Sequence, residues 1–153
     1  MAGKTFKSTA GEVVDIPFKM KAVVQAGTGA ATSWPATLRF DTEFAVPLMD
    51  KQPQNVLVKV MSAAVTAYDV DLAEGENGGV SVGDVAGSAC AGIVVAVGEG
   101  CKRVAINDEV YCTCTGALAE YVSVQEDLVA AKPKALTWVL RATEDAGGAY
   151  RAN

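Results

Sequence analysis

Short apolar runs, each ended by glycine or by other turn residues, recur along most of this chain. One of them, residues 86–101, reads AGSACAGIVVAVGEGC and carries no charge before Glu99. Runs of this length rich in β-branched residues fit strands better than helices, and the glycines between them supply turns and close backbone approaches. We therefore expect a mainly β protein, either a sandwich or a small barrel, with few helices.

The same pattern predicts where the individual elements lie. We expect strands over residues 21–26, 36–44, 56–65, 90–97, 109–113, 117–124 and 128–131. Residues 74–84, EGENGGVSVGD, are typical of a flexible loop. One helix of some length is predicted over residues 137–146, because Gly147 and Gly148 would end it there.

The glycines of residues 86–101 could instead serve a phosphate site, but their spacing argues against it. A P-loop needs Lys followed by Ser or Thr after its last glycine, and no Lys follows Gly92. The pair Gly98 and Gly100 is followed by Cys-Lys-Arg, so the third glycine of a dinucleotide fingerprint is missing. We therefore expect Gly87 and Gly92 to bend a strand or admit another backbone, and Gly98 and Gly100 to form a turn.

Length and charge narrow the class of protein. The 153 residues suffice for one domain, and the net charge of -5 with scattered basic residues argues against nucleic acid as a partner. No apolar run approaches the length of about 18 residues that a membrane helix needs, so we expect no membrane partner. The N-terminus lacks the apolar core of a secretory signal, which predicts a cytoplasmic protein with reduced cysteines.

The chain contains no histidine, and this excludes His-activated nucleophiles and His-ligated zinc. Alternation along a strand places Cys112 and Cys114 on one face. They could form a metal or redox pair, but two small buried thiols are the favoured interpretation, and we expect no bound metal. Cys90 either packs in the core or lines a substrate site.

Several short motifs occur in a characteristic order between Ser8 and Leu136. They include NVLVKVMSAAVTAYDVDLAEG and the positions Gly87, Gly92, Val97, Gly98, Asp108, Val110, Gly116, Ala119, Glu120, Tyr121, Lys132 and Pro133. Together they resemble the GroES-like N-terminal domain of the medium-chain dehydrogenase/reductase superfamily. The resemblance implies a mainly β fold, a GroES-like partly open β-barrel with a few short helices, over residues 20–136. Residues 1–19 would be a partly ordered extension, and residues 137–153 a helix and tail that begin a nucleotide-binding domain.

Departures from the zinc-dependent branch of that superfamily are informative. That branch has Cys where this chain has Thr66, and His-Glu where it has Ser88-Ala89. The short hairpin around Cys112 and Cys114 is instead similar to the zinc-free quinone and enoyl reductases. The resemblance implies a substrate cleft near Thr66, Tyr68, Asp69, Asp71, Ser88 and Cys90. Tyr68 could give a proton to an enolate oxygen there, or simply pack at the mouth of the barrel.

The resemblance implies the substrate-side domain of a zinc-independent NAD(P)H-dependent reductase of quinones or activated alkenes. A small-molecule substrate and NADPH or NADH would then be expected in a full-length parent. This chain alone shows no glycine fingerprint, so we expect it to bind no cofactor and to be inactive by itself. The alternative is a free-standing, non-catalytic GroES-like barrel that binds a protein partner or assembles into a homo-oligomer.

Overall fold

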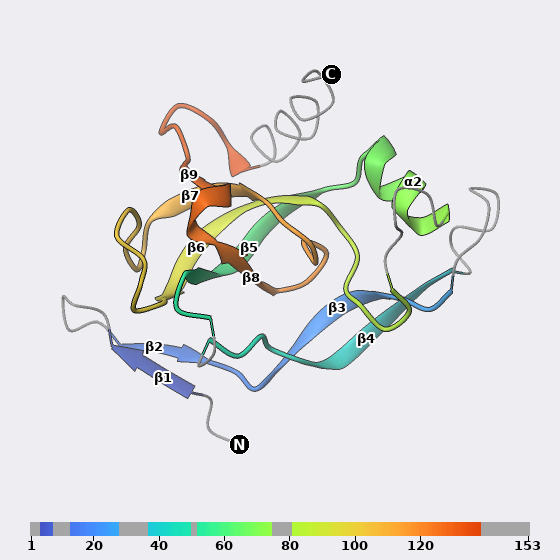
Figure 1. Ribbon diagram of the computed structural model, residues 1–153, viewed down its shortest axis with the longest axis horizontal. Helices are drawn as coiled ribbons and strands as arrows, with labels where there is room; N and C mark the ends of the chain where they lie inside the picture. The colour runs from blue at the N-terminus through green and yellow to red at the C-terminus, as the bar shows by residue number, and fades with distance from the viewer. Residues whose placement is uncertain (1–3, 8–12, 28–36, 50–51, 75–80, 139–153) are drawn as a thin grey trace.

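The computed structural model describes residues 4–7, 13–27, 37–49, 52–74 and 81–138. Within these ranges the chain is mostly strand (Figure 1). The elements in chain order are β1 (Lys4–Lys7), β2 (Val13–Ile16), β3 (Lys19–Gln25), β4 (Leu38–Ala45), β5 (Asn55–Ala64), α2 (Ala67–Glu74), β6 (Ala89–Val97), β7 (Glu109–Thr113), β8 (Tyr121–Gln125), the 3-10 turn η3 (Glu126–Leu128) and β9 (Val129–Ala131). The mainly β class expected from the sequence is confirmed. Neither described helix has the length and apolar character needed to cross a membrane.

A five-stranded antiparallel sheet forms the centre of the structure, in the order β8-β5-β6-β7-β9. Its two longest strands, β5 and β6, lie side by side, with Val58 opposite Val94 and Val60 opposite Gly92. The register shifts twice along this pair, once between Leu57 and Val58 and once between Val60 and Ser62. Such bulges increase local twist, and they allow the sheet to curve as a barrel wall does.

Two hairpins complete the strands that the structure describes. The β3–β4 hairpin passes beside the large sheet, and the short β1–β2 hairpin lies at one end (Figure 1). Isolated bridges from Ala22 to Ala119 and from Val24 to Val85 tie β3 to the loops of the large sheet. The described strands thus form three sheets and not one closed ring, and bridges join the β3–β4 sheet to loops of the large one.

Apolar side chains cover both faces of the central strands, which explains the continuous apolar runs in the sequence. Val56, Val58 and Val94 belong to one buried cluster with residues of β7 and β8. Leu57 and Val95, one position along each strand, belong to a second cluster with residues of β3. Alternation sends neighbours to opposite faces, so both faces of β5 and β6 are buried.

Two glycines have the structural roles expected from the sequence. Gly87 has a φ of 98°, a left-handed conformation that strains other residues, and an added Cβ would lie 2.8 Å from the Leu118 backbone nitrogen. At Gly92 a Cβ would collide with the carbonyl oxygen of Lys59 on β5 and lie 2.7 Å from Val58 Cγ1. Glycine at position 92 therefore allows strand β5 to approach closely. It is required because there is no room for a side chain, and not because of a positive φ.

The structure differs from the sequence expectation at several elements. Helix α2 and the β1–β2 hairpin were not expected, and the strand expected from residue 117 begins only at Tyr121. Residues 117–120 instead pair with a loop and with β3: the amides of Ala117 and Leu118 donate to the carbonyls of Gly87 and Ala86, and Ala119 bridges to Ala22. Of the helix expected over residues 137–146, only the first two residues lie within the described part of the chain.

Candidate functional site

A cavity of about 400 Å³ opens between the start of helix α2 and the ends of β6 and β7. Two of the residues that the sequence placed in a cleft, Tyr68 and Ser88, line it. Tyr68 is 41% exposed and lines the cavity with part of its surface open to solvent. The other lining residues are Leu72, Ser81, Asp84, Gly87, Thr113, Cys114, Thr115 and Leu128. The cavity thus combines hydroxyl groups, a thiol and apolar side chains, as small-molecule sites do.

Thr66 and Asp69 lie beside this cavity and begin helix α2. The Asp69 carboxylate oxygen Oδ2 accepts hydrogen bonds from the Thr66 backbone amide (2.7 Å) and from the Thr66 hydroxyl (2.9 Å). The Thr66 hydroxyl in turn accepts the Asp69 amide at 3.4 Å, which completes a capping box. Asp69 is buried, and its second oxygen has no hydrogen-bond partner among the described residues. Asp71 lies further along the helix and does not line the cavity.

Three of the four cysteines meet at the inner edge of the cavity. Cys90 stands directly opposite Cys112 in the β6–β7 ladder, and their Sγ atoms are 3.3 Å apart. Cys114 follows two residues later on the same face, with its Sγ atom 3.9 Å from that of Cys90. The sequence paired only Cys112 with Cys114, because alternation shows neighbours along one strand but not the register between strands.

Hydrogen bonds within this cluster shift the pKa values of Cys90 and Cys112 in opposite directions. Hydrogen bonds with Cys112 and with Cys114 lower the pKa of Cys90, although burial opposes the shift. The pKa of Cys112 is raised by its hydrogen bonds with Cys114 and Cys90 and by burial.

Comparison with known families identifies the domain. The family model described as the alcohol dehydrogenase GroES-like domain matches residues 52–134. The chain belongs to this family. The matched GroES-like segment holds the whole five-stranded sheet, helix α2 and the cavity described above.

Two curated relatives of this GroES-like domain are described as an oxidoreductase and a reductase. An NADPH-dependent alkenal/one oxidoreductase of Arabidopsis thaliana is 33% identical over 131 residues, covering 78% of this chain and 32% of the relative. A 2-methylene-furan-3-one reductase of Solanum lycopersicum is 33% identical over 137 residues, covering 82% of this chain and 34% of the relative. The chain thus spans about a third of the length of these curated relatives.

A solved structure agrees with this assignment at the level of the fold. The quinone oxidoreductase of Coxiella burnetii superposes with a TM-score of 0.71 at 22% sequence identity, covering 82% of this chain and 40% of that chain. The family match confirms the expected resemblance to the GroES-like domain, and the superposition confirms the GroES-like fold.

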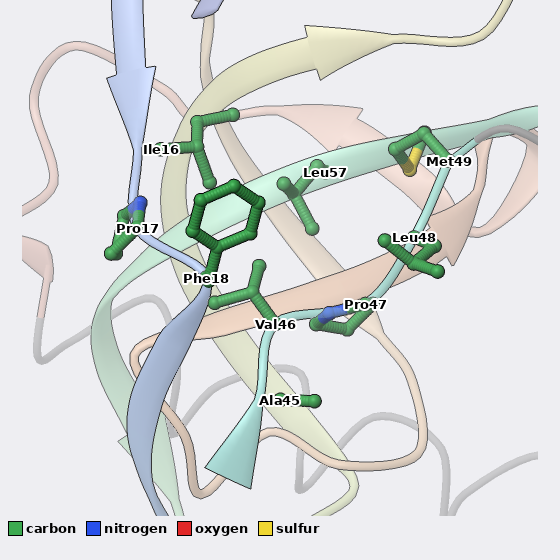
Figure 2. Close-up of a pocket in the computed structure, with 9 residues that line it drawn as sticks. All are labelled: Ile16, Pro17, Phe18, Ala45, Val46, Pro47, Leu48, Met49 and Leu57. Atoms are coloured by element: carbon green, nitrogen blue, oxygen red, sulfur yellow. The ribbon is translucent and has the colours of Figure 1, made fainter. Parts of the chain in front are cut away.

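A second cavity of the GroES-like domain was not expected from the sequence. It has a volume of about 230 Å³ (Figure 2). It lies between the connection from β2 to β3 and the segment that runs from the end of β4 toward β5. Its lining is apolar throughout, formed by Ile16, Pro17, Phe18, Ala45, Val46, Pro47, Leu48, Met49 and Leu57. No lining side chain carries a group that could transfer a proton, so the cavity between α2 and β7 is the better candidate for chemistry.

Proposed function

We propose that the chain is the substrate-side domain of a zinc-independent NADPH- or NADH-dependent reductase of quinones or activated alkenes. The observation that carries this proposal is the 33% identity, over 78% of the chain, with a protein described as an NADPH-dependent alkenal/one oxidoreductase. We place the domain in residues 20–136, after an extension of residues 1–19 and before residues 137–153, which would lead into a nucleotide-binding domain. The cytoplasm, a reducing compartment, suits its four free cysteines.

The cavity between α2 and β7 supports a role in reducing a conjugated carbonyl compound. Hydride added to the β-carbon of such a substrate moves an electron pair to the carbonyl oxygen, which becomes an enolate. Hydroxyl donors at that oxygen stabilise the developing charge. Tyr68 and Ser88 provide two hydroxyl groups on the same cavity, and the capping box of Thr66 and Asp69 fixes the start of the helix that carries Tyr68.

The hydride itself has to come from a nicotinamide cofactor. In our proposal this chain contains no binding site for that cofactor. The chemistry of hydride transfer belongs to the cofactor, while the protein orients the substrate and stabilises charge. We assign only these last two tasks to the 153 residues. We accordingly expect the chain alone to be inactive.

A binding experiment tests the assignment of the cavity. The saturated ketone that alkenone reduction would yield is a suitable probe, because it cannot alkylate the cysteines. Titrated into the isotopically labelled chain at concentrations up to about 1 mM, a weak affinity on the usual scale, it should shift amide resonances around Tyr68, Ser88 and Thr113. The Tyr68→Phe variant should bind the ketone more weakly.

A matched variant and the negative outcomes complete this test. Tyr121 lines a different cavity, so Tyr121→Phe should bind the ketone as the wild type does. Shifts confined to the apolar cavity around Leu48 and Phe18 would contradict the proposal. The absence of shifts, with self-association that rises with protein concentration, would favour the non-catalytic barrel instead.

A further inference from the structure

We propose that Cys90, Cys112 and Cys114 form a binding site for one monovalent copper ion, in place of the sequence-based expectation of no bound metal, which considered only Cys112 and Cys114. The three residues offer sulfur ligands at one point in the interior, where strands β6 and β7 lie side by side (Figure 1). This inference does not depend on the proposed reductase function, because none of the hydroxyl groups assigned to the substrate takes part in it.

The spacing of the sulfur atoms fits three bonds to one ion. The Sγ atoms of Cys90 are 3.3 Å from Cys112 and 3.9 Å from Cys114, and all three sulfurs lie within 4.8 Å of one another. Metal–thiolate bonds of about 2.3 Å in a trigonal plane separate the sulfurs by about 4 Å. An ion can therefore enter with small side-chain rotations and without movement of the strands.

The backbone holds the three cysteines in place before any ion arrives. Cys90 and Cys112 are paired residues of the ladder, and each is only 1% exposed. The ladder continues beyond them, because the Cys114 amide donates to the Ser88 carbonyl at 2.8 Å. Ligands carried by paired strands lose little freedom on binding, which favours affinity.

The set of ligands favours monovalent copper over zinc. Zinc in structural sites takes four ligands in a tetrahedron, whereas soft monovalent copper is satisfied by three thiolates. Within the described residues no carboxylate joins the three sulfurs in a group of atoms that are all within 4.8 Å of one another. Asp69 is the nearby acid: its Oδ2 oxygen is bonded to Thr66, and its Oδ1 oxygen, which has no hydrogen-bond partner among the described residues, lies outside this group of atoms. Hard ions such as magnesium and calcium prefer oxygen ligands and would not compete.

The cavity between α2 and β7 provides the route by which the ion would enter. Cys114 is half-buried and lines this cavity together with Ser88 and Thr113. The ion would meet Cys114 first and then pass inward to Cys90 and Cys112. Each thiol that binds loses its proton to water in the cavity, and the ion's charge offsets part of the negative charge created beside the Asp69 carboxylate.

The test is an anaerobic titration of the reduced 153-residue chain with monovalent copper, in competition with the chromophoric chelator bicinchoninate. We expect one copper ion per chain, and X-ray absorption should show three sulfur neighbours at about 2.3 Å. Replacing any one ligand, as in Cys112→Ser or Cys114→Ser, should weaken binding more than about 100-fold, beyond the usual effect of residues that only support a ligand. Cys101→Ser is the matched control, because Cys101 lies apart and contacts the carbonyl oxygens of Pro53 and Asn55.

Two further measurements keep the result decisive if a variant fails to fold. Circular dichroism shows whether each serine variant retains its strands, and Cys114→Ser removes the most accessible of the three ligands. In the folded wild type, copper should protect Cys114, the accessible ligand, from alkylation by N-ethylmaleimide and leave Cys101 reactive, whereas Cys90 and Cys112 are buried in either state. Fewer than three sulfur neighbours, equal weakening in Cys101→Ser, or a preference for zinc over copper would overturn the proposal.

Discussion

Gly92 shows how one residue can fix the path of a sheet. Its position opposite Val60 leaves no room for a side chain, because the Lys59 carbonyl oxygen occupies the place of a Cβ. Strands β5 and β6 approach closely there, next to a shift in register. Glycine at this point therefore serves the packing of two backbones, whether or not a ligand binds nearby.

Replacement of Gly92 by alanine should destabilise the fold by about 2–4 kcal/mol, at the upper end for a single substitution. The reason is that the new methyl group can be accommodated only if the β5 backbone moves. Urea unfolding of the chain without ligand measures the change. Gly27→Ala is the control, since nothing lies within 4 Å of a Cβ at Gly27 and its unfolding midpoint should stay near that of the wild type. An unchanged midpoint for Gly92→Ala would show that the glycine is not structural.

The cysteines show what sequence could and could not predict about the candidate site. Alternation was enough to place Cys112 and Cys114 on one face of a strand. It could not place Cys90 against Cys112, because the register of two strands depends on the turn between them and on tertiary packing. Tyr68 and Ser88 were suggested by resemblance alone, and the structure places both on one cavity.

At the scale of elements, helix α2 depends on its first turn. The capping box of Thr66 and Asp69 satisfies backbone amides that the helix itself leaves without partners. The sequence AYDVDLAE has no clear apolar stripe, which is why periodicity did not predict this helix. The capping residues were noticed for a different reason, as candidates for the substrate cleft.

Removing the Asp69 carboxylate should therefore loosen the whole helix. We expect Asp69→Ala to cost about 1 kcal/mol and to speed amide hydrogen exchange in α2 about fivefold. Asp71→Ala, on the same helix but outside the capping box, should leave exchange nearly unchanged. If both variants exchange alike, the capping box does not hold the helix, and Asp69 would have to be explained by ligand binding.

The turn η3 anchors the loop that follows β6 through a single buried carboxylate. One oxygen of Glu126 accepts the backbone amides of Arg103 (2.5 Å), Lys102 (2.8 Å) and Val104 (3.2 Å). These bonds, that of Arg103 first, lower the pKa of Glu126 below its ordinary value of 4.5. Composition and periodicity gave no sign of this contact, because it joins residues more than twenty positions apart.

The lowered pKa of Glu126 predicts a pH dependence of stability. A carboxyl whose pKa is lower in the folded state stabilises that state above the unfolded pKa, and the gain is lost as pH falls through the folded pKa. Glu126→Gln should therefore be less stable than the wild type at neutral pH, with the difference shrinking below about pH 4.3. Urea unfolding across this range measures the difference. Asp127→Asn, at a neighbour whose side chain is 93% exposed, should show no comparable trend.

At the scale of the whole molecule, the sequence predicted the strands better than their arrangement. The bounds of β7 were predicted in full, and β5 and β6 to within a residue or so, because buried apolar runs between turns leave little choice. The order β8-β5-β6-β7-β9 was not predicted, because residue patterns along one strand do not show which other strands it pairs with. The β1–β2 hairpin was missed because the N-terminal segment carries only a weak alternation of apolar residues.

Whether a dinucleotide can bind is also a question about the molecule as a whole. Pyrophosphate binds where a glycine-rich turn presents free amides at the start of a helix. The α-helix that the structure describes, α2, begins instead with a carboxylate, because Asp69 lies in its first turn and occupies that end with negative charge. A phosphate approaching this end would meet repulsion and amides that are already bonded.

We therefore expect the 153-residue chain to bind NADPH no more tightly than a dissociation constant of about 10 µM. Titration calorimetry measures this, with the full-length Arabidopsis thaliana relative, described as NADPH-dependent, as the positive control. Tighter binding by the chain would mean that its β domain contains a dinucleotide site of a kind that neither a glycine fingerprint nor a helix start provides. In that case the division of labour we propose, with substrate held by this domain and cofactor held elsewhere, would be wrong.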